Sequence, residues 1–201
     1  LDACSPATGW QNPRVRRAWA TLPCLLAMAL GGCGYSRALA PSVNQPLSPQ
    51  GFRWLSFPAA GVSLEAPRSW TRIDEQPPLV VVLTSARAVV AVWRYPRRRP
   101  LPSTAGQLAA TTRSLIAAVR AGQPSIQVIR TRVVRLGGAP GVELDALERL
   151  RGQLRRVRST HLYSGQQEIV LEEYAPVDQF HAVDHAVFSP LRHSLRILGT
   201  S

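Results

Sequence analysis

Strand-forming runs separated by glycine fill the second half of this chain, and they restrict its fold more than any other feature. Gly137, Gly138, Gly152 and Gly165 mark the turns, because glycine accepts positive φ angles and tight bends without steric cost. Neighbouring strands joined by such short turns pair as an antiparallel meander. The runs of this predicted meander are 125–136, 141–150, 153–163 and 168–174.

The residues before the meander predict further strands. The ordered part begins at 52–57, and 61–67 alternates apolar with polar residues as a half-buried strand does. Two valine-rich runs, 79–84 and 88–95, have a short turn between them and indicate an antiparallel hairpin.

Two helices complete the predicted domain. Ser103 or Thr104 caps a helix over 105–121, which glycine and proline residues end. Residues 177–197 place apolar side chains on one helical stripe, and Pro190 bends or interrupts this second helix. The stripe comprises Phe180, Val183, Val187, Phe188, Leu191 and Leu195.

These elements predict an α+β domain over 52–201, in which about six antiparallel strands are flanked by a central and a C-terminal helix. Their pattern resembles the PsbP-like fold, which implies an α/β/α sandwich over 52–198. That fold includes bacterial lipoproteins of unassigned role and a eukaryotic import factor that binds a small GTPase, so the resemblance implies no particular activity. The resemblance lies in 61–67 with Trp70, the central helix, the turn and strand at 138–144, and the closing helix at 188–195.

A basic and then uncharged segment near the amino terminus predicts export. Arg14, Arg16 and Arg17 precede thirteen residues without charge at 18–30. So short a stretch fits a signal-peptide core, whereas a permanent membrane span needs about twenty apolar residues. We therefore expect residues 1–32 to be upstream residues and a signal peptide.

The four residues 30–33, Leu-Gly-Gly-Cys, resemble the lipobox of bacterial lipoproteins. This resemblance implies that Cys33 begins the mature protein and carries acyl chains such as palmitate, which hold it on the extracytoplasmic side of a bacterial membrane. A buried hydrophobic helix with Cys33 as a small core residue is the alternative. Residues 33–51 are rich in proline and serine and predict a flexible tether.

The domain carries no recognisable catalytic constellation, and we expect no enzyme, no cofactor and no metal. All three cysteines, Cys4, Cys24 and Cys33, precede it, which leaves no disulfide framework or thiolate zinc site. A Gly-x-Ser-x-Gly nucleophile motif is absent from the sequence. His181 and His185 share one helix face and offer two metal ligands, to which Asp184 or Asp178 would add a carboxylate. The general-base glutamate of the zinc-protease helix motif is missing, and a solvated helix face is the favoured interpretation.

The net charge of +12 comes from 24 basic residues, all of which are arginine. Arg97, Arg98 and Arg99 form a basic loop between prolines without acidic neighbours in the sequence, and we expect it to contact an anion, a headgroup or a partner. Nucleic acid is not expected, because an exported protein seldom meets it and aromatic residues do not interleave with these arginines.

Charged residues of opposite sign face one another across the predicted meander. With turns at 151–152 and 164–166, Arg158 lies opposite Asp145 on one neighbouring strand and near Glu172 or Glu173 on the other, because the register is defined only to within one residue. We interpret them as structural ion pairs on the open face of the sheet, with Arg158 the best paired of the arginines.

Taken together, these features favour a non-enzymatic envelope lipoprotein that binds a protein partner, of unknown identity, or assists an assembly. The open sheet face or the Arg97 loop would carry this contact. The alternative is a carrier that holds a small apolar or amphipathic ligand between the sheet and the helices. A filled core favours the first hypothesis, and a large apolar cavity favours the second.

Overall fold

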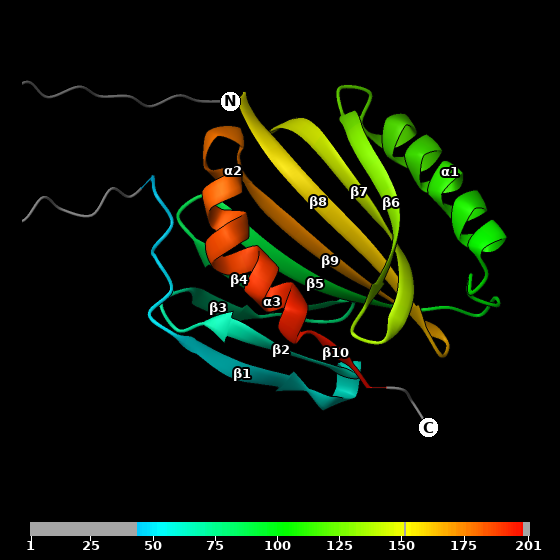
Figure 1. Cartoon of the computed structure of the whole chain (residues 1–201), viewed down its shortest axis with the longest axis horizontal. Coiled ribbons are helices and arrows are strands. Elements are labelled where there is room, and N and C mark those ends of the chain that lie inside the picture. The colour runs from blue at the N-terminus through cyan, green and yellow to red at the C-terminus, as the bar shows by residue number, and fades with distance from the viewer. Residues whose placement is uncertain (1–43, 151, 199–201) are drawn as a thin grey trace, which may run out of the picture. The chain divides into compact units, whose positions relative to one another are not determined.

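The computed structural model describes residues 44–150 and 152–198, which form an α+β domain of two antiparallel sheets and flanking helices (Figure 1). The predicted fold class is therefore confirmed. The predicted signal peptide and Cys33 lie outside the described residues.

The larger sheet has seven strands, all antiparallel to their neighbours, in the order β3-β4-β5-β9-β8-β7-β6. The predicted meander is confirmed as β6 to β9, and the valine-rich hairpin β4–β5 joins it because β5 pairs with β9. The strands are β3 (Thr71–Asp74), β4 (Leu79–Ser85), β5 (Ala88–Pro96), β6 (Gln127–Leu136), β7 (Ala139–Leu150), β8 (Gln153–Ser164) and β9 (Gln167–Pro176).

The smaller sheet has three strands in the order β1-β2-β10. Its strands are β1 (Phe52–Phe57), β2 (Val62–Pro67) and β10 (Arg196–Ile197), with a 3-10 turn at Pro58–Ala60. The described residues form ten strands, more than the predicted six or so, and two of them, β3 with four exposed residues and β10 with only two, fall in no predicted strand. Segments so short carry no alternating pattern, and β10 exists only because it pairs with β2.

Helix α1 (Ala105–Gly122) begins at the predicted residue, and of the two candidate caps, Ser103 and Thr104, Thr104 is the N-cap. The Thr104 hydroxyl accepts a hydrogen bond from the Gln107 backbone N–H at 3.3 Å, and the Gln107 side chain accepts one from the Thr104 N–H at 3.1 Å. These reciprocal bonds form a capping box, which satisfies donors that the first helical turn leaves without partners.

The C-terminal helix is broken into three pieces: α2 (Val177–Val183), a π-helical turn η2 (Asp184–Phe188) and α3 (Ser189–Ser194). Pro190 lies in the first turn of α3, directly after η2, so the predicted interruption is confirmed. The predicted helical end at residue 197 is wrong, because Arg196 and Ile197 form β10.

The helices lie on opposite faces of the larger sheet. Along β8, Leu162 packs in the main core with Phe180 and Phe188, whereas the next residue, Tyr163, packs under Leu108 of α1. Successive side chains of a strand point to opposite faces, so α2–η2–α3 covers one face and α1 the other. In Figure 1 the orange and red helices cross the sheet and α1 stands beside β6.

The described end of the predicted tether is part of the fold. The Leu47 backbone N–H donates to the Ser85 hydroxyl at 2.8 Å, and the Trp70 indole N–H donates to the Leu47 carbonyl at 3.1 Å. The Ser69 hydroxyl donates to the Ser48 carbonyl at 2.9 Å. Residues 44–51, which we predicted as flexible, are therefore bonded to the domain, and the prediction is wrong for this stretch.

Candidate functional site

A cluster of charged side chains lies on the face of the larger sheet that α2–η2–α3 covers. Strand pairing places Asp145 of β7, Arg158 of β8 and Glu173 of β9 side by side. The pairing of Arg158 with Asp145 is the predicted one, and the structure selects Glu173 over Glu172 on β9. We call the charged groups around Arg158 the ion cluster. It comprises Arg130, Arg132, Glu143, Asp145, Arg156, Arg158, Glu173, Asp184 and Arg192.

Arg158 stands at the centre of the ion cluster and is only 5% exposed. Its Nη1 lies 3.3 Å from Glu173 Oε2, and its Nη1 and Nη2 donate to the two carboxylate oxygens of Asp184 at 2.5 and 3.1 Å. Burial disfavours the charged guanidinium, but the hydrogen bond and negative charge of Asp184, with Glu173 and Glu143, raise the pKa of Arg158 above its ordinary value.

Asp145 lies opposite Arg158 in the strand register, but its hydrogen bonds come from other arginines. Its carboxylate accepts two hydrogen bonds from Arg156, at 3.1 and 2.9 Å, and one from Arg130 at 3.1 Å. Burial favours the neutral acid, yet the hydrogen bonds and charges of these arginines outweigh it and lower the pKa of Asp145.

The expectation of an open sheet face is wrong, because the C-terminal helices cover the ion cluster. Asp184 of η2 binds Arg158, and Arg192 of α3 donates to Glu143 Oε2 at 2.6 Å. Neither residue was predicted to belong to the cluster. A signal for them existed, since Asp184 lies four residues from both Phe180 and Phe188 on the helical stripe, and Arg192 follows Phe188 by four.

Glu173 is fully buried and incompletely bonded. Its Oε2 lies 3.3 Å from Arg158 Nη1 and 4.0 Å from Arg192 Nη1. Its Oε1 has no hydrogen-bond partner among the described residues. Burial raises the pKa of Glu173 to about 8, although Arg192 and Arg158 act in the opposite direction. The carboxyl group is therefore mostly protonated at neutral pH.

A polar crevice of about 360 Å³ opens beside the ion cluster, between strands of the sheet and helix α3. We call it the arginine crevice. It is lined by Arg130, Arg132, Leu136, Arg158, Asp184, Ser189, Arg192 and His193. Five guanidinium groups of the ion cluster face four carboxyl groups, and protonation of Glu173 increases the positive excess. A site of this charge favours an anion.

The basic loop differs from its prediction, because Arg97 is paired. Arg97 Nε donates to Glu168 Oε2 at 2.7 Å, and the same buried carboxylate lies 2.6 Å from His161 Nδ1. Burial favours the neutral acid, but His161 and Arg97 lower the pKa of Glu168. Within the described chain, Arg98 and Arg99 are exposed and enter no ion pair.

The two helical histidines gain no metal partners in the described residues. His181 and His185 are both exposed. In ranges 44–150 and 152–198, histidine, cysteine and acidic side chains nowhere form a group of three or more that would hold a metal ion.

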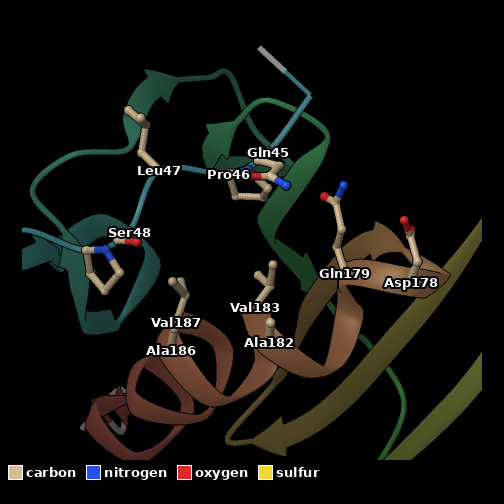
Figure 2. Close-up of a pocket in the computed structure, with 11 residues that line it drawn as sticks. Gln45, Pro46, Leu47, Ser48, Asp178, Gln179, Ala182, Val183, Ala186 and Val187 are labelled. Atoms are coloured by element: carbon tan, nitrogen blue, oxygen red, sulfur yellow. The ribbon is translucent and has the colours of Figure 1, made fainter. Parts of the chain in front are cut away.

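An apolar groove of about 320 Å³ lies between the first described residues and the C-terminal helix. Figure 2 shows Pro46 and Leu47 on one side and the α2–η2 side chains on the other, with Asp178 and Gln179 at one end. The helix side chains that line it are Ala182, Val183, Ala186 and Val187. This groove contains few polar groups and suits contact rather than chemistry.

A second apolar space lies under the C-terminal half of α1. Only Leu108 of this 18-residue helix is buried, so the helix packs loosely against the sheet. The cleft of about 350 Å³ is lined mainly by apolar side chains such as Val119, Leu144 and Val157, with Tyr174 and Glu172 at one side. The Tyr174 hydroxyl donates to Glu172 Oε2 at 2.5 Å.

Comparison with known proteins identifies the fold. No protein-family model matches the chain, and no curated protein sequence matches it. The solution structure of CyanoP, the cyanobacterial PsbP of Synechocystis sp. PCC 6803, is similar at 15% identity, covers 84% of this chain and 98% of its own, and has a TM-score of 0.56. The crystal structure of LpqN of Mycobacterium tuberculosis, involved in cell envelope biogenesis, is similar at 14% identity over 77% of this chain and 90% of its own, with a TM-score of 0.51.

The domain thus has a PsbP-like fold, as the sequence resemblance implied. Neither of these two similar proteins is described as an enzyme. Among the described residues, every helix is too short or too polar to cross a membrane.

Proposed function

We propose that this protein is a non-enzymatic accessory module of the bacterial cell envelope, anchored by a lipid on Cys33, that binds an acidic segment of an envelope protein in the arginine crevice. The fold supports an accessory role, because the similar structures include an envelope-biogenesis protein. The lipobox resemblance supports the anchor.

The positive excess of the arginine crevice is the observation that carries this proposal. Arg130 and Arg132 are half-exposed at the edge strand β6, with side-chain exposures of 53% and 44%. Each guanidinium presents five N–H donors in a planar fork that matches a carboxylate, and only some of these donors are used inside the cluster.

The buried carboxylates do not depend on these two exposed arginines. Asp145 keeps its two hydrogen bonds from Arg156, and Glu143 keeps the one from Arg192. Arg130 and Arg132 therefore duplicate contacts that the cluster already has. A surface that retains surplus arginines beside satisfied carboxylates is suited to recognise an acidic partner.

The binding test uses the mature acylated protein in detergent and a fluorescent oligoglutamate peptide, with an oligoglutamine peptide of equal length as the uncharged probe. We expect the variant Arg130→Gln/Arg132→Gln to bind oligoglutamate about tenfold more weakly at low salt. Salt should weaken binding to the unmodified protein by screening.

The control is Arg98→Gln/Arg99→Gln, which removes equal charge from the basic loop. It should leave binding close to that of the unmodified protein. If both double variants lose affinity equally, binding follows net charge and the crevice is not the site. If neither loses affinity, the proposal is also contradicted.

The anchor is tested separately, by mass spectrometry of the mature amino terminus from cells. We expect a protein that begins at acylated Cys33 and lacks residues 1–32. A cytosolic protein that still carries these residues without acylation would contradict the anchor.

A second candidate function, a carrier of a small amphipathic ligand, is favoured by the cleft under α1. Ala146 lies at the base of this cleft and is 4% exposed, so Ala146→Leu should fill the space. We expect it to weaken binding of anilinonaphthalene sulfonate, whereas Ala109→Leu on the exposed face of α1 should not. Equal binding by both variants would contradict the carrier.

A further inference from the structure

Three exposed aliphatic side chains gather at one end of the larger sheet. Leu150 and Leu154 flank the β7–β8 turn and are 43% and 40% exposed, and Val177 at the start of α2 is 41% exposed. Arg155 of β8 pairs with Pro176, the last residue of β9. This pairing places Leu154 next to Val177, the residue that follows β9. In Figure 1 the start of β8 and α2 lie side by side.

The two leucines point to opposite sides of the hairpin tip. Leu154 pairs with Arg149, whereas Leu150 pairs with Gln153, so the two side chains belong to opposite faces of the strand pair. In a soluble protein, water contacts both sides of such a tip. Both leucines therefore stay exposed to solvent unless another surface covers them. A tip with this pattern is suited to enter a lipid interface.

The described chain begins at the same end. The Asn44 carbonyl accepts from Gln179 of α2 at 3.2 Å, and the Asn44 side-chain oxygen accepts from Arg87 of the β4–β5 turn at 3.1 Å. Gln179 is two residues from Val177, so the strand tip, the helix start and the entry of the chain are neighbours.

The charge of this end complements an anionic membrane. Arg149 is exposed and Arg87 and Arg155 are half-buried, and the acidic residues nearest these strand ends are Asp178 and Glu148. Basic side chains within a Debye length of anionic headgroups are attracted to them.

We propose that this end of the domain, with Leu150, Leu154 and Val177, lies against the membrane that holds the lipid anchor. The inference rests on the proposed anchor at Cys33. Ten residues separate Cys33 from Asn44, and a chain of that length reaches about 35 Å at full extension. The tether therefore keeps this end of the domain near the bilayer, and the exposed leucines and the arginines favour its contact with the lipid.

The test places one fluorophore on the mature acylated protein in vesicles. Cys4 and Cys24 leave with the signal peptide and Cys33 is blocked by its thioether, so an introduced cysteine is the single free thiol. Leu154→Cys carries an environment-sensitive dye in vesicles of phosphatidylcholine with or without phosphatidylglycerol. Gln166→Cys is the control, because Gln166 is exposed in the turn at the opposite end of β8.

We expect the dye at position 154 to shift its emission to the blue and to be quenched by nitroxide-labelled lipid, more strongly with phosphatidylglycerol. The dye at position 166 should report water in both vesicles. Equal, aqueous signals from the two positions on protein that floats with the vesicles would overturn the membrane contact and leave the anchor intact. Protein that does not float with the vesicles would contradict the anchor itself and, with it, this inference.

A second pair of variants tests the hairpin tip without a label. Leu150→Ser/Leu154→Ser should increase proteolytic cleavage at the β7–β8 turn of vesicle-bound protein several-fold, because the tip leaves the interface. The same acylated variants in detergent, before vesicles are added, should be cleaved at the rate of the unmodified protein. A vesicle-bound rate that does not change would count against the contact.

Discussion

Arg158 and Asp184 form a bidentate ion pair that joins the centre of the sheet to the C-terminal helix. The two residues are 26 positions apart in the chain, and two guanidinium nitrogens donate to two carboxylate oxygens at 2.5 and 3.1 Å. Because Arg158 is buried between Glu173 and Asp184, the pair fixes the position of η2 on the sheet and forms one wall of the arginine crevice.

Replacement of the buried arginine should destabilise the fold strongly. Arg158→Met leaves the carboxylate of Asp184 and the buried carboxyl of Glu173 without their guanidinium, and loss of one partner from a buried pair costs about 3–5 kcal/mol in the free energy of unfolding. Asp184→Asn, at the more exposed side of the pair, should cost about 1 kcal/mol. Urea denaturation measures both, and a loss under 1 kcal/mol for Arg158→Met would contradict the prediction.

Glu173 should make the stability of the protein fall as the pH rises. A carboxyl whose pKa is higher in the folded than in the unfolded chain stabilises the fold fully below its ordinary pKa and loses this contribution as the pH passes its folded pKa. For Glu173 this window runs from 4.5 to about 8. The charged groups that face it are Arg158, Arg192, Asp184 and Glu143.

Glu173→Gln removes this titration. The variant should match the unmodified protein at pH 5 and exceed it at pH 9, by on the order of 4 kcal/mol in the free energy of unfolding. Denaturation at a series of pH values gives the difference. If the free energies of unfolding of the variant and the unmodified protein differ by the same amount at pH 5 and pH 9, Glu173 does not titrate in this window.

Gly141 should not tolerate a side chain. A Cβ at this position would lie 2.3 Å from the His161 carbonyl oxygen and 2.8 Å from Leu162 Cδ2 on the neighbouring strand. Gly141→Ala therefore forces β7 and β8 apart, and we expect a loss of about 1–3 kcal/mol in thermal or chemical denaturation. The matched control is Gly106→Ala in the first turn of α1, where nothing lies within 4 Å, and there alanine should not lower the stability of the protein.

The three arginines of the basic loop should differ in their effect on stability. Arg97 is structural, whereas Arg98 and Arg99 lie on the surface. Arg97→Gln removes a charged partner of Glu168, whose side chain is 6% exposed, and we expect a loss of about 1–3 kcal/mol in urea denaturation. Arg98→Gln should stay within about 0.5 kcal/mol of the unmodified protein. Equal effects of the two substitutions would contradict the role of Glu168.

Much of the fold follows from local patterns that do not need the rest of the chain. The helix cap at Ser103 or Thr104, the valine-rich hairpin β4–β5 and the glycine turns of the meander all follow from neighbouring residues. The strands β3 and β10 were missed because four and two residues are too few for a periodic pattern. Their pairing is decided by the strands beside them.

The candidate site was predicted only in part. The alternating charges of β7, β8 and β9 placed Arg158 between Asp145 and either Glu172 or Glu173, but charged residues on one side of a strand ordinarily indicate a solvated face. The ion pair of Arg97 with Glu168 could not be predicted either, because the two residues are 71 positions apart and no local pattern connects them.

The amino-acid sequence by itself determined the strand and helix periods, the turns, and the register that brings acidic and basic residues together across the meander. Only the tertiary structure decided that this charged face is interior, because burial of a charge depends on whether distant groups neutralise it. Asp184 and Arg192 supply that neutralisation from the C-terminal helix, and they turn a predicted surface ladder into the buried wall of a crevice.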